Sequence, residues 1–104
     1  LPCKKGIEID KLYGRWRTIG HDRMDTGYKY DVYKIDPSGI ISVQSFNYNE
    51  KSQEDVSVIK SIKNNEIILE YKNKLFTLEI LNLCENCFEF RQKPYKQSIV
   101  LNRM

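Results

Sequence analysis

Apolar and polar residues alternate with a period of two along most of this chain, and short turn sequences interrupt the alternation. A period of two puts successive side chains on opposite faces of a strand, so the pattern predicts β-strands. No segment has an apolar stripe with a helical period over three turns. Val, Ile, Tyr and Phe are frequent and Ala is absent, which also favours strands. We expect strands at residues 12–20, 27–35, 40–48, 55–62, 66–72, 75–83, 87–92 and 97–103.

The connections between these segments are short. Residues 36–39 read Asp-Pro-Ser-Gly, with Pro and Gly at the second and fourth positions of a tight turn. Short turns join antiparallel neighbours, so the eight strands should form a meander. Closing it into an up-and-down barrel removes both sheet edges. A two-sheet sandwich is the alternative, but it would need longer crossings. One short helical turn is expected in residues 7–12.

The 104 residues are enough for one domain, and we assign residues 1–104 to a single barrel. No apolar run approaches the 18 residues of a membrane-spanning helix. The net charge of +3 is spread evenly along the chain, which argues against nucleic acid as a partner. We expect a monomer.

The inner face of the barrel can be predicted by anchoring the alternation on Trp16, the one tryptophan. Charged neighbours such as Arg15 and Arg17 then point outward. The inward set on the first two strands is Leu12, Gly14, Trp16, Thr18, Tyr28, Tyr30 and Val32. On the last four strands it is Ile67, Leu69, Tyr71, Phe76, Leu78, Ile80, Phe88, Phe90, Ile99 and Leu101. In the third and fourth strands, Val56 and Val58 fit one face, and Phe46 and Tyr48 fit another.

Three cysteines leave several interpretations open. Cys84 and Cys87 form a Cys-x-x-Cys pair, but a zinc site would need both Cys3 and His21 as further ligands, without the usual spacing. A thioredoxin-like motif would need a helix after the pair, whereas strands flank it here. We favour a disulfide from Cys3 to Cys84 or Cys87, with one thiol left over; three reduced cysteines are the alternative.

A disulfide, together with a chain that begins at Leu1 without Met, suggests a mature secreted or periplasmic protein.

The segment Lys11-Leu12-Tyr13-Gly14-Arg15-Trp16 resembles the start of the first strand in lipocalins and the wider calycin superfamily, which carry Gly-x-Trp there. In that family the Trp closes the narrow end of the barrel, and an Arg near the end of the last strand packs across its ring. Arg103 holds the matching position in this chain. Lipocalins proper are longer and carry a helix after the barrel, so the chain looks more like the compact bacterial lipocalin-like domains. The resemblance implies a barrel closed below by Trp16.

In such a meander the turns after the first, third, fifth and seventh strands surround the opposite, open end. That end should carry His21, Arg23, Met24, Tyr48 and Tyr95. His21 is the only histidine and is predicted as a solvated loop residue or a ligand contact.

No nucleophile–base pair, phosphate loop or complete metal set can be assembled, so we expect no enzyme, cofactor or metal. The first expectation is a binding protein that holds a small hydrophobic ligand in the open end. Its predicted contacts are Trp16, Tyr28, Tyr30, Tyr48, Phe76, Phe90, His21 and Tyr95. The alternative is a protein-interaction module, such as an enzyme inhibitor or immunity-type protein, that acts through the open-end loops.

Overall fold

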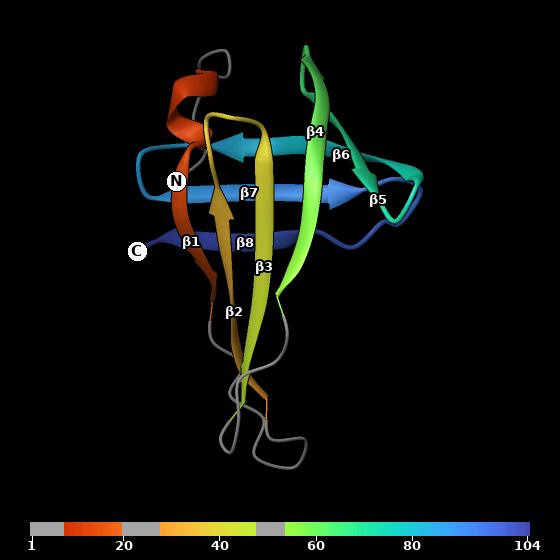
Figure 1. The fold of residues 1–104 in the computed structure, drawn as a ribbon. Helices are drawn as coiled ribbons and strands as arrows, with labels where there is room; N and C mark the ends of the chain where they lie inside the picture. The colour runs from red at the N-terminus through yellow and green to blue at the C-terminus, as the bar shows by residue number, and fades with distance from the viewer. Residues whose placement is uncertain (1–7, 20–27, 48–53) are drawn as a thin grey trace.

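A computed structural model describes residues 8–19, 28–47 and 54–104 of the chain. A short 3-10 helix, Ile9–Leu12, precedes eight strands that pair in chain order, and the last strand pairs with the first to close the barrel (Figure 1). The strands are β1 (Gly14–Thr18), β2 (Tyr28–Ile35), β3 (Ile40–Asn47), β4 (Asp55–Lys63), β5 (Glu66–Tyr71), β6 (Lys74–Leu83), β7 (Cys87–Gln92) and β8 (Ile99–Arg103). All neighbours are antiparallel. The predicted barrel is confirmed, and the sandwich is excluded.

The turns follow from local chemistry. In the turn between β2 and β3, the Gly39 amide donates to the Asp36 carbonyl at 2.9 Å, and the Ser38 amide donates to the Asp36 carboxylate at 2.8 Å. The hydrogen bonds from Ser38 hold the pKa of the Asp36 carboxyl below its ordinary value. Asn64 in the β4–β5 hairpin and Asn73 in the β5–β6 hairpin adopt positive φ, a conformation that Asn tolerates well.

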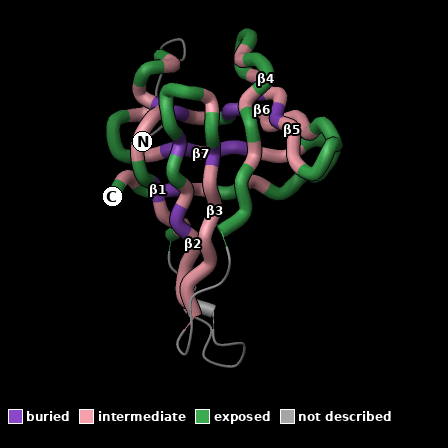
Figure 2. Tube along the Cα trace, viewed as in Figure 1, coloured by how far each residue is buried: buried purple, intermediate pink, exposed green. Residues whose placement is uncertain are grey.

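The core lies where the two halves of the barrel cross. β2, β3 and β4 run across β6, β7 and β8 (Figure 1), and the buried segments gather on β1, β2 and β7 in that region (Figure 2). The packed cluster contains Leu12, Trp16, Ile35, Ile41, Ile67, Leu69, Ile80, Leu83, Phe88, Phe90 and Leu101. Apolar burial at this crossing supplies the main force that closes the barrel.

The predicted inner face is confirmed for the core residues of β1 and β5 to β8, but it is wrong for β2. Tyr33 and Ile35 pack in the core, so Asp31 shares the inner face, whereas Tyr30 and Val32 face outward. The prediction placed Lys29 and Asp31 outside because they are charged, and this choice put β2 in the opposite register. A slip of one residue moves every side chain to the other face.

Outside the barrel, Tyr30 stacks on Phe46 with ring centroids 5.1 Å apart, and the Arg17 guanidinium lies 4.1 Å from the Tyr30 ring centre. Phe46 therefore shares the outer face with the exposed Val56 and Val58, because the pairing with β4 places Ser42 opposite Val56. The prediction that Phe46 and these valines occupy different faces is wrong.

Trp16 forms the floor of the barrel and is fully buried. Its indole Nε1 donates a hydrogen bond to the Leu12 carbonyl oxygen at 2.9 Å, and the Phe88 ring packs on it at 5.6 Å between centroids. Trp16 pairs with Arg103 across β1 and β8, and the guanidinium carbon lies 4.1 Å from the indole ring centre. The contact expected between Arg103 and Trp16 is thus present.

Arg103 also joins three parts of the chain. Its Nη1 donates to the Tyr13 carbonyl oxygen at 2.9 Å, Nη2 donates to that of Lys11, and Nε donates to that of Glu85 in the turn after β6. Gly14 allows this approach, because its φ is +128° and a Cβ there would lie 2.7 Å from Arg103 Nη1. One guanidinium therefore holds the N-terminal segment against the last strand and a distant turn.

We expect Gly14→Ala to destabilise the fold by about 2–4 kcal/mol, because it adds both backbone strain and a displacement of Arg103. Gly39→Ala is the matched control: its φ is +96°, but its Cβ would meet nothing closer than 3.6 Å. Urea unfolding, followed by the fluorescence of Trp16, measures the stability of both variants. Equal losses in the two variants would show that the contact with Arg103 does not matter.

Arg103→Met should cost about 2–4 kcal/mol, since it removes the cation–π contact and leaves carbonyl oxygens without donors. Arg103→Lys should recover only a small part of this, because an ammonium cannot present the planar fork to three oxygens. Arg15→Met, on the exposed side of β1, should change stability by less than about 0.5 kcal/mol. A similar urea midpoint for Arg103→Met and Arg15→Met would contradict the role given to Arg103.

Candidate functional site

The end of the barrel opposite Trp16 is open. There β1, β3, β5 and β7 end and β2, β4, β6 and β8 begin, as the meander predicts. His21, Arg23, Met24 and Tyr48, which were predicted at this end, lie outside the described residues. Tyr95 does lie there and is 64% exposed.

An apolar cavity of about 160 Å³ lies inside the barrel, above the floor. Side chains from seven strands, β2 to β8, line it, including Ile35, Val43, Leu69 and Phe90. An engineered cavity of similar size, about 150 Å³, lined by aliphatic and aromatic side chains, stays dry and binds benzene. The interior is therefore neither filled nor roomy: it has space for one group of about the size of a benzene ring.

A wide cup of about 970 Å³ opens above this cavity. Its wall is formed by the ends of β1, β2 and β7 and by residues 95–100. The cup and the cavity share three lining residues, Tyr33, Gln92 and Ile99, so the cavity lies directly beneath the cup. A molecule could thus place a small apolar group in the cavity and a larger polar part in the cup.

Polar groups occupy the inner wall at the level of the cup. The Ser45 hydroxyl donates to Asp31 Oδ1 at 2.6 Å, and the Asp31 amide donates to the Thr18 hydroxyl at 2.9 Å. On β4, Asp55 accepts a hydrogen bond from the Tyr71 hydroxyl at 2.8 Å. Both carboxylates thus belong to the inner face near the mouth, whereas the deeper walls are apolar.

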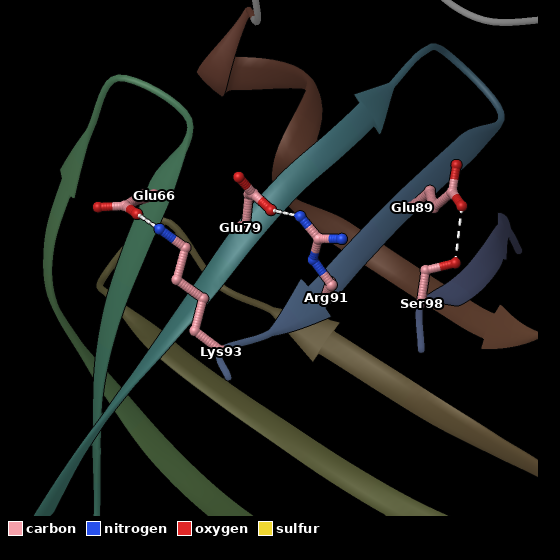
Figure 3. Close-up of polar contacts among 6 residues, drawn as sticks. All are labelled: Glu66, Glu79, Glu89, Arg91, Lys93 and Ser98. Atoms are coloured by element: carbon pink, nitrogen blue, oxygen red, sulfur yellow. Dashed lines mark hydrogen bonds and ion pairs between the residues drawn. The ribbon is translucent and has the colours of Figure 1, made fainter. Parts of the chain in front are cut away.

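Residues 93–98, which join β7 to β8, contribute to the rim of the cup, and both ends of this segment are fixed. Lys93 pairs with Glu66 across β6, and the Ser98 hydroxyl donates to Glu89 at 2.8 Å (Figure 3). Arg91 pairs with Glu79 between them, so polar contacts cross the outer face of β5 to β8 (Figure 3). The hydrogen bond to Glu66 and the attraction of its charge raise the pKa of Lys93 above its ordinary value. Tyr95, Lys96 and Gln97 are therefore held beside the cup.

The structure brings only part of the predicted contact set together. Phe90 lines the cavity, and Tyr95 lines the cup. Phe76 faces inward opposite Leu69 and lies 6.5 Å from the Tyr71 ring, but it lies outside the cavity wall. Trp16 is shielded from the cavity by Phe88, and Tyr30 faces outward. The side chain of Tyr28 is not among those described.

The residues of the site that the sequence prediction missed include Asp31, Tyr33 and Gln92. Ile35, the last apolar residue before the tight turn at Asp36-Pro37, offered another anchor for the alternation. Counting back by two from Ile35 gives Tyr33 and Asp31. Gln92 follows Phe88 and Phe90 by the same count.

Within the described ranges, no group of three or more His, Cys, Asp or Glu side chains is placed to hold a metal ion. Cys87 is a free cysteine, so the pairing of Cys3 with Cys87 considered above is not formed, and Cys3 itself lies outside the described residues. None of the described helices has the length and apolarity needed to cross a membrane.

Comparison with known proteins adds no further assignment. No family model matches the chain, and neither a curated protein nor a solved structure matches it. What the structure shows is therefore a closed, eight-stranded antiparallel barrel with a Trp–Arg floor, a small apolar cavity and a wide cup that carries several polar side chains.

Proposed function

We propose that this protein is a non-enzymatic binding protein that holds one small, largely apolar ligand in the open end of the barrel. The observation that carries the proposal is the apolar cavity of about 160 Å³ directly beneath a cup that opens to solvent. Sites for small molecules have this form, with apolar walls and a few placed polar groups.

The cavity volume limits the ligand. Its deepest group is about the size of a phenyl ring, and the remainder of the molecule lies in the cup. Each Å² of apolar surface that leaves water contributes about 25 cal/mol, so filling the cavity supplies most of the affinity. Polar side chains of the cup, such as Gln92, then set the orientation of the ligand.

The resemblance to lipocalins supports the same function. Gly14, Trp16 and Arg103 form the floor that the family pattern implies, in a barrel of the same strand number and order. We infer a compact, lipocalin-like protein whose calyx is reduced to one small cavity.

A protein partner is the second candidate, and the exposure of Tyr95 on the rim favours it. Large exposed aromatic side chains often anchor protein interfaces. The rigid attachment of residues 93–98 would present Tyr95 to such a partner at little cost in entropy.

Filling the cavity separates the two functions. We expect 3-phenylpropan-1-ol to bind the wild-type protein, and Val43→Phe to weaken that binding at least about tenfold, because the new ring occupies the cavity. Val56→Phe adds the same bulk on the outer face, where Val56 is 48% exposed, and should leave binding unchanged. Isothermal titration calorimetry measures the affinities, and near-ultraviolet circular dichroism checks the fold. If small aromatic compounds do not bind the wild type, the ligand-binding proposal is wrong.

We also propose that Cys3 and Cys84 form a disulfide and that the protein works in an extracytoplasmic, oxidising compartment. Cys84 lies in the turn after β6, beside Glu85, whose carbonyl oxygen shares the Arg103 guanidinium with Lys11. Eight residues separate Cys3 from Lys11, and a chain of that length spans up to about 27 Å. The N-terminal segment can therefore bring Cys3 to this turn.

Peptide mapping of the unreduced protein, alkylated before digestion, should recover Cys3 linked to Cys84 and Cys87 carrying the alkyl group. The bond closes a loop of about 80 residues, so Cys84→Ser should lower stability by roughly 3–5 kcal/mol in the chain-entropy model. Cys87→Ser is the control and should have a much smaller effect. Alkylation of all three cysteines in protein purified without reductant would contradict both the bond and the compartment.

A further inference from the structure

The cup contains a carboxylate that nothing in the described structure neutralises. Asp31 lies on the inner face of β2 and lines the cup, half-buried. Its Oδ1 accepts a hydrogen bond from Ser45. The ion pairs between described residues join Lys11 to Glu8, Lys60 to Glu70, Arg91 to Glu79 and Lys93 to Glu66. No described Lys or Arg is therefore paired with Asp31.

A half-buried carboxylate that is paired with no described cation keeps part of its capacity to interact with a charged partner. A charged aspartate can only accept hydrogen bonds, and Ser45 supplies a donor to one of its oxygens. Oδ2 accepts no hydrogen bond from a described residue and remains able to accept a charge-assisted one. Ser45 and Thr18 also fix the strand and side chain around it, so that the acceptor is held in place before any ligand arrives.

Asp31 stands next to the cavity. Asp31 and Tyr33 are neighbours on the same face of β2, about 7 Å apart along the strand, and Tyr33 lines both the cup and the cavity. The anionic group and the apolar cavity are thus separated by the length of a short alkyl chain. The cup residue of opposite charge, Lys96, is exposed, so water weakens its influence.

We propose that the ligand is a small amphipathic cation, an arylalkylamine or an amine of similar shape. Its ammonium group binds the Asp31 carboxylate, and its apolar end fills the cavity. This inference rests on the proposed binding function and specifies the class of its ligand.

A matched series of ligands tests the inference apart from the function itself. 3-Phenylpropan-1-amine, 3-phenylpropan-1-ol and 3-phenylpropanoate share one apolar group and differ in charge. Calorimetry on the wild-type protein should find the amine bound about tenfold or more tighter than the alcohol, and the carboxylate bound most weakly, because a hydrogen bond to a charged group contributes about 1.5–3 kcal/mol.

Asp31→Asn should reduce the affinity for the amine about tenfold or more and leave that for the alcohol within about twofold. Asp55→Asn removes the other inner-face carboxylate of the mouth and should preserve the preference for the amine. The wild-type series decides the question even if Asp31→Asn fails to fold.

Three outcomes would overturn the inference and leave the binding function standing: equal affinities for amine and alcohol, tightest binding of the carboxylate, or an Asp55→Asn effect as large as that of Asp31→Asn. Failure of all three compounds to bind would overturn the function and the inference together.

Discussion

The guanidinium of Arg103 is the contact on which the arrangement of this barrel depends. It covers the indole of Trp16 and donates hydrogen bonds to carbonyl oxygens of the N-terminal segment and of the turn after β6. The closure between β1 and β8 joins strands from opposite ends of the chain, and such non-local pairings carry a large cost in loop-closure entropy. A planar cation with several fixed donors compensates for that cost at one point. It also closes one end of the barrel, so that any ligand has to enter from the other.

Much of the fold can be predicted from the sequence because its local signals agree with each other. Alternation, turn residues and the absence of Ala all indicate short antiparallel strands, and Gly14, Trp16 and Arg103 indicate the floor. The face of β2 cannot be predicted in the same way. Tyr30 and Val32 on one side, and Tyr33 and Ile35 on the other, are all apolar or aromatic, so alternation alone does not distinguish the two faces. The charges of Lys29 and Asp31 then favoured the wrong face.

The candidate site was harder to predict than the fold, for a related physical reason. The rule that charged residues face water placed Asp31 outside. A carboxylate can nevertheless face inward where hydroxyl groups lie close to it and the open end of the barrel admits water. Those conditions depend on β1 and β3, whose Thr18 and Ser45 meet Asp31 only after the strands pair. The volume of the cavity cannot be predicted from the sequence either, because it is the space that remains after all the side chains have packed. The aromatic residues Trp16 and Phe88 fill the lower barrel and leave only a small cavity above.

The two ends of the barrel therefore use a charged side chain in opposite ways. At the floor, the cation of Arg103 is satisfied within the protein by a ring and by carbonyl oxygens, and this makes the floor rigid. At the mouth, the anion of Asp31 receives a hydroxyl donor but no described cation, which leaves part of its interaction energy available. Stability and binding compete for the same interactions, since a charge already paired inside the fold has little left for a ligand. Among the described residues, the network is complete at the floor and incomplete at the mouth, which is the arrangement that the proposed binding function requires.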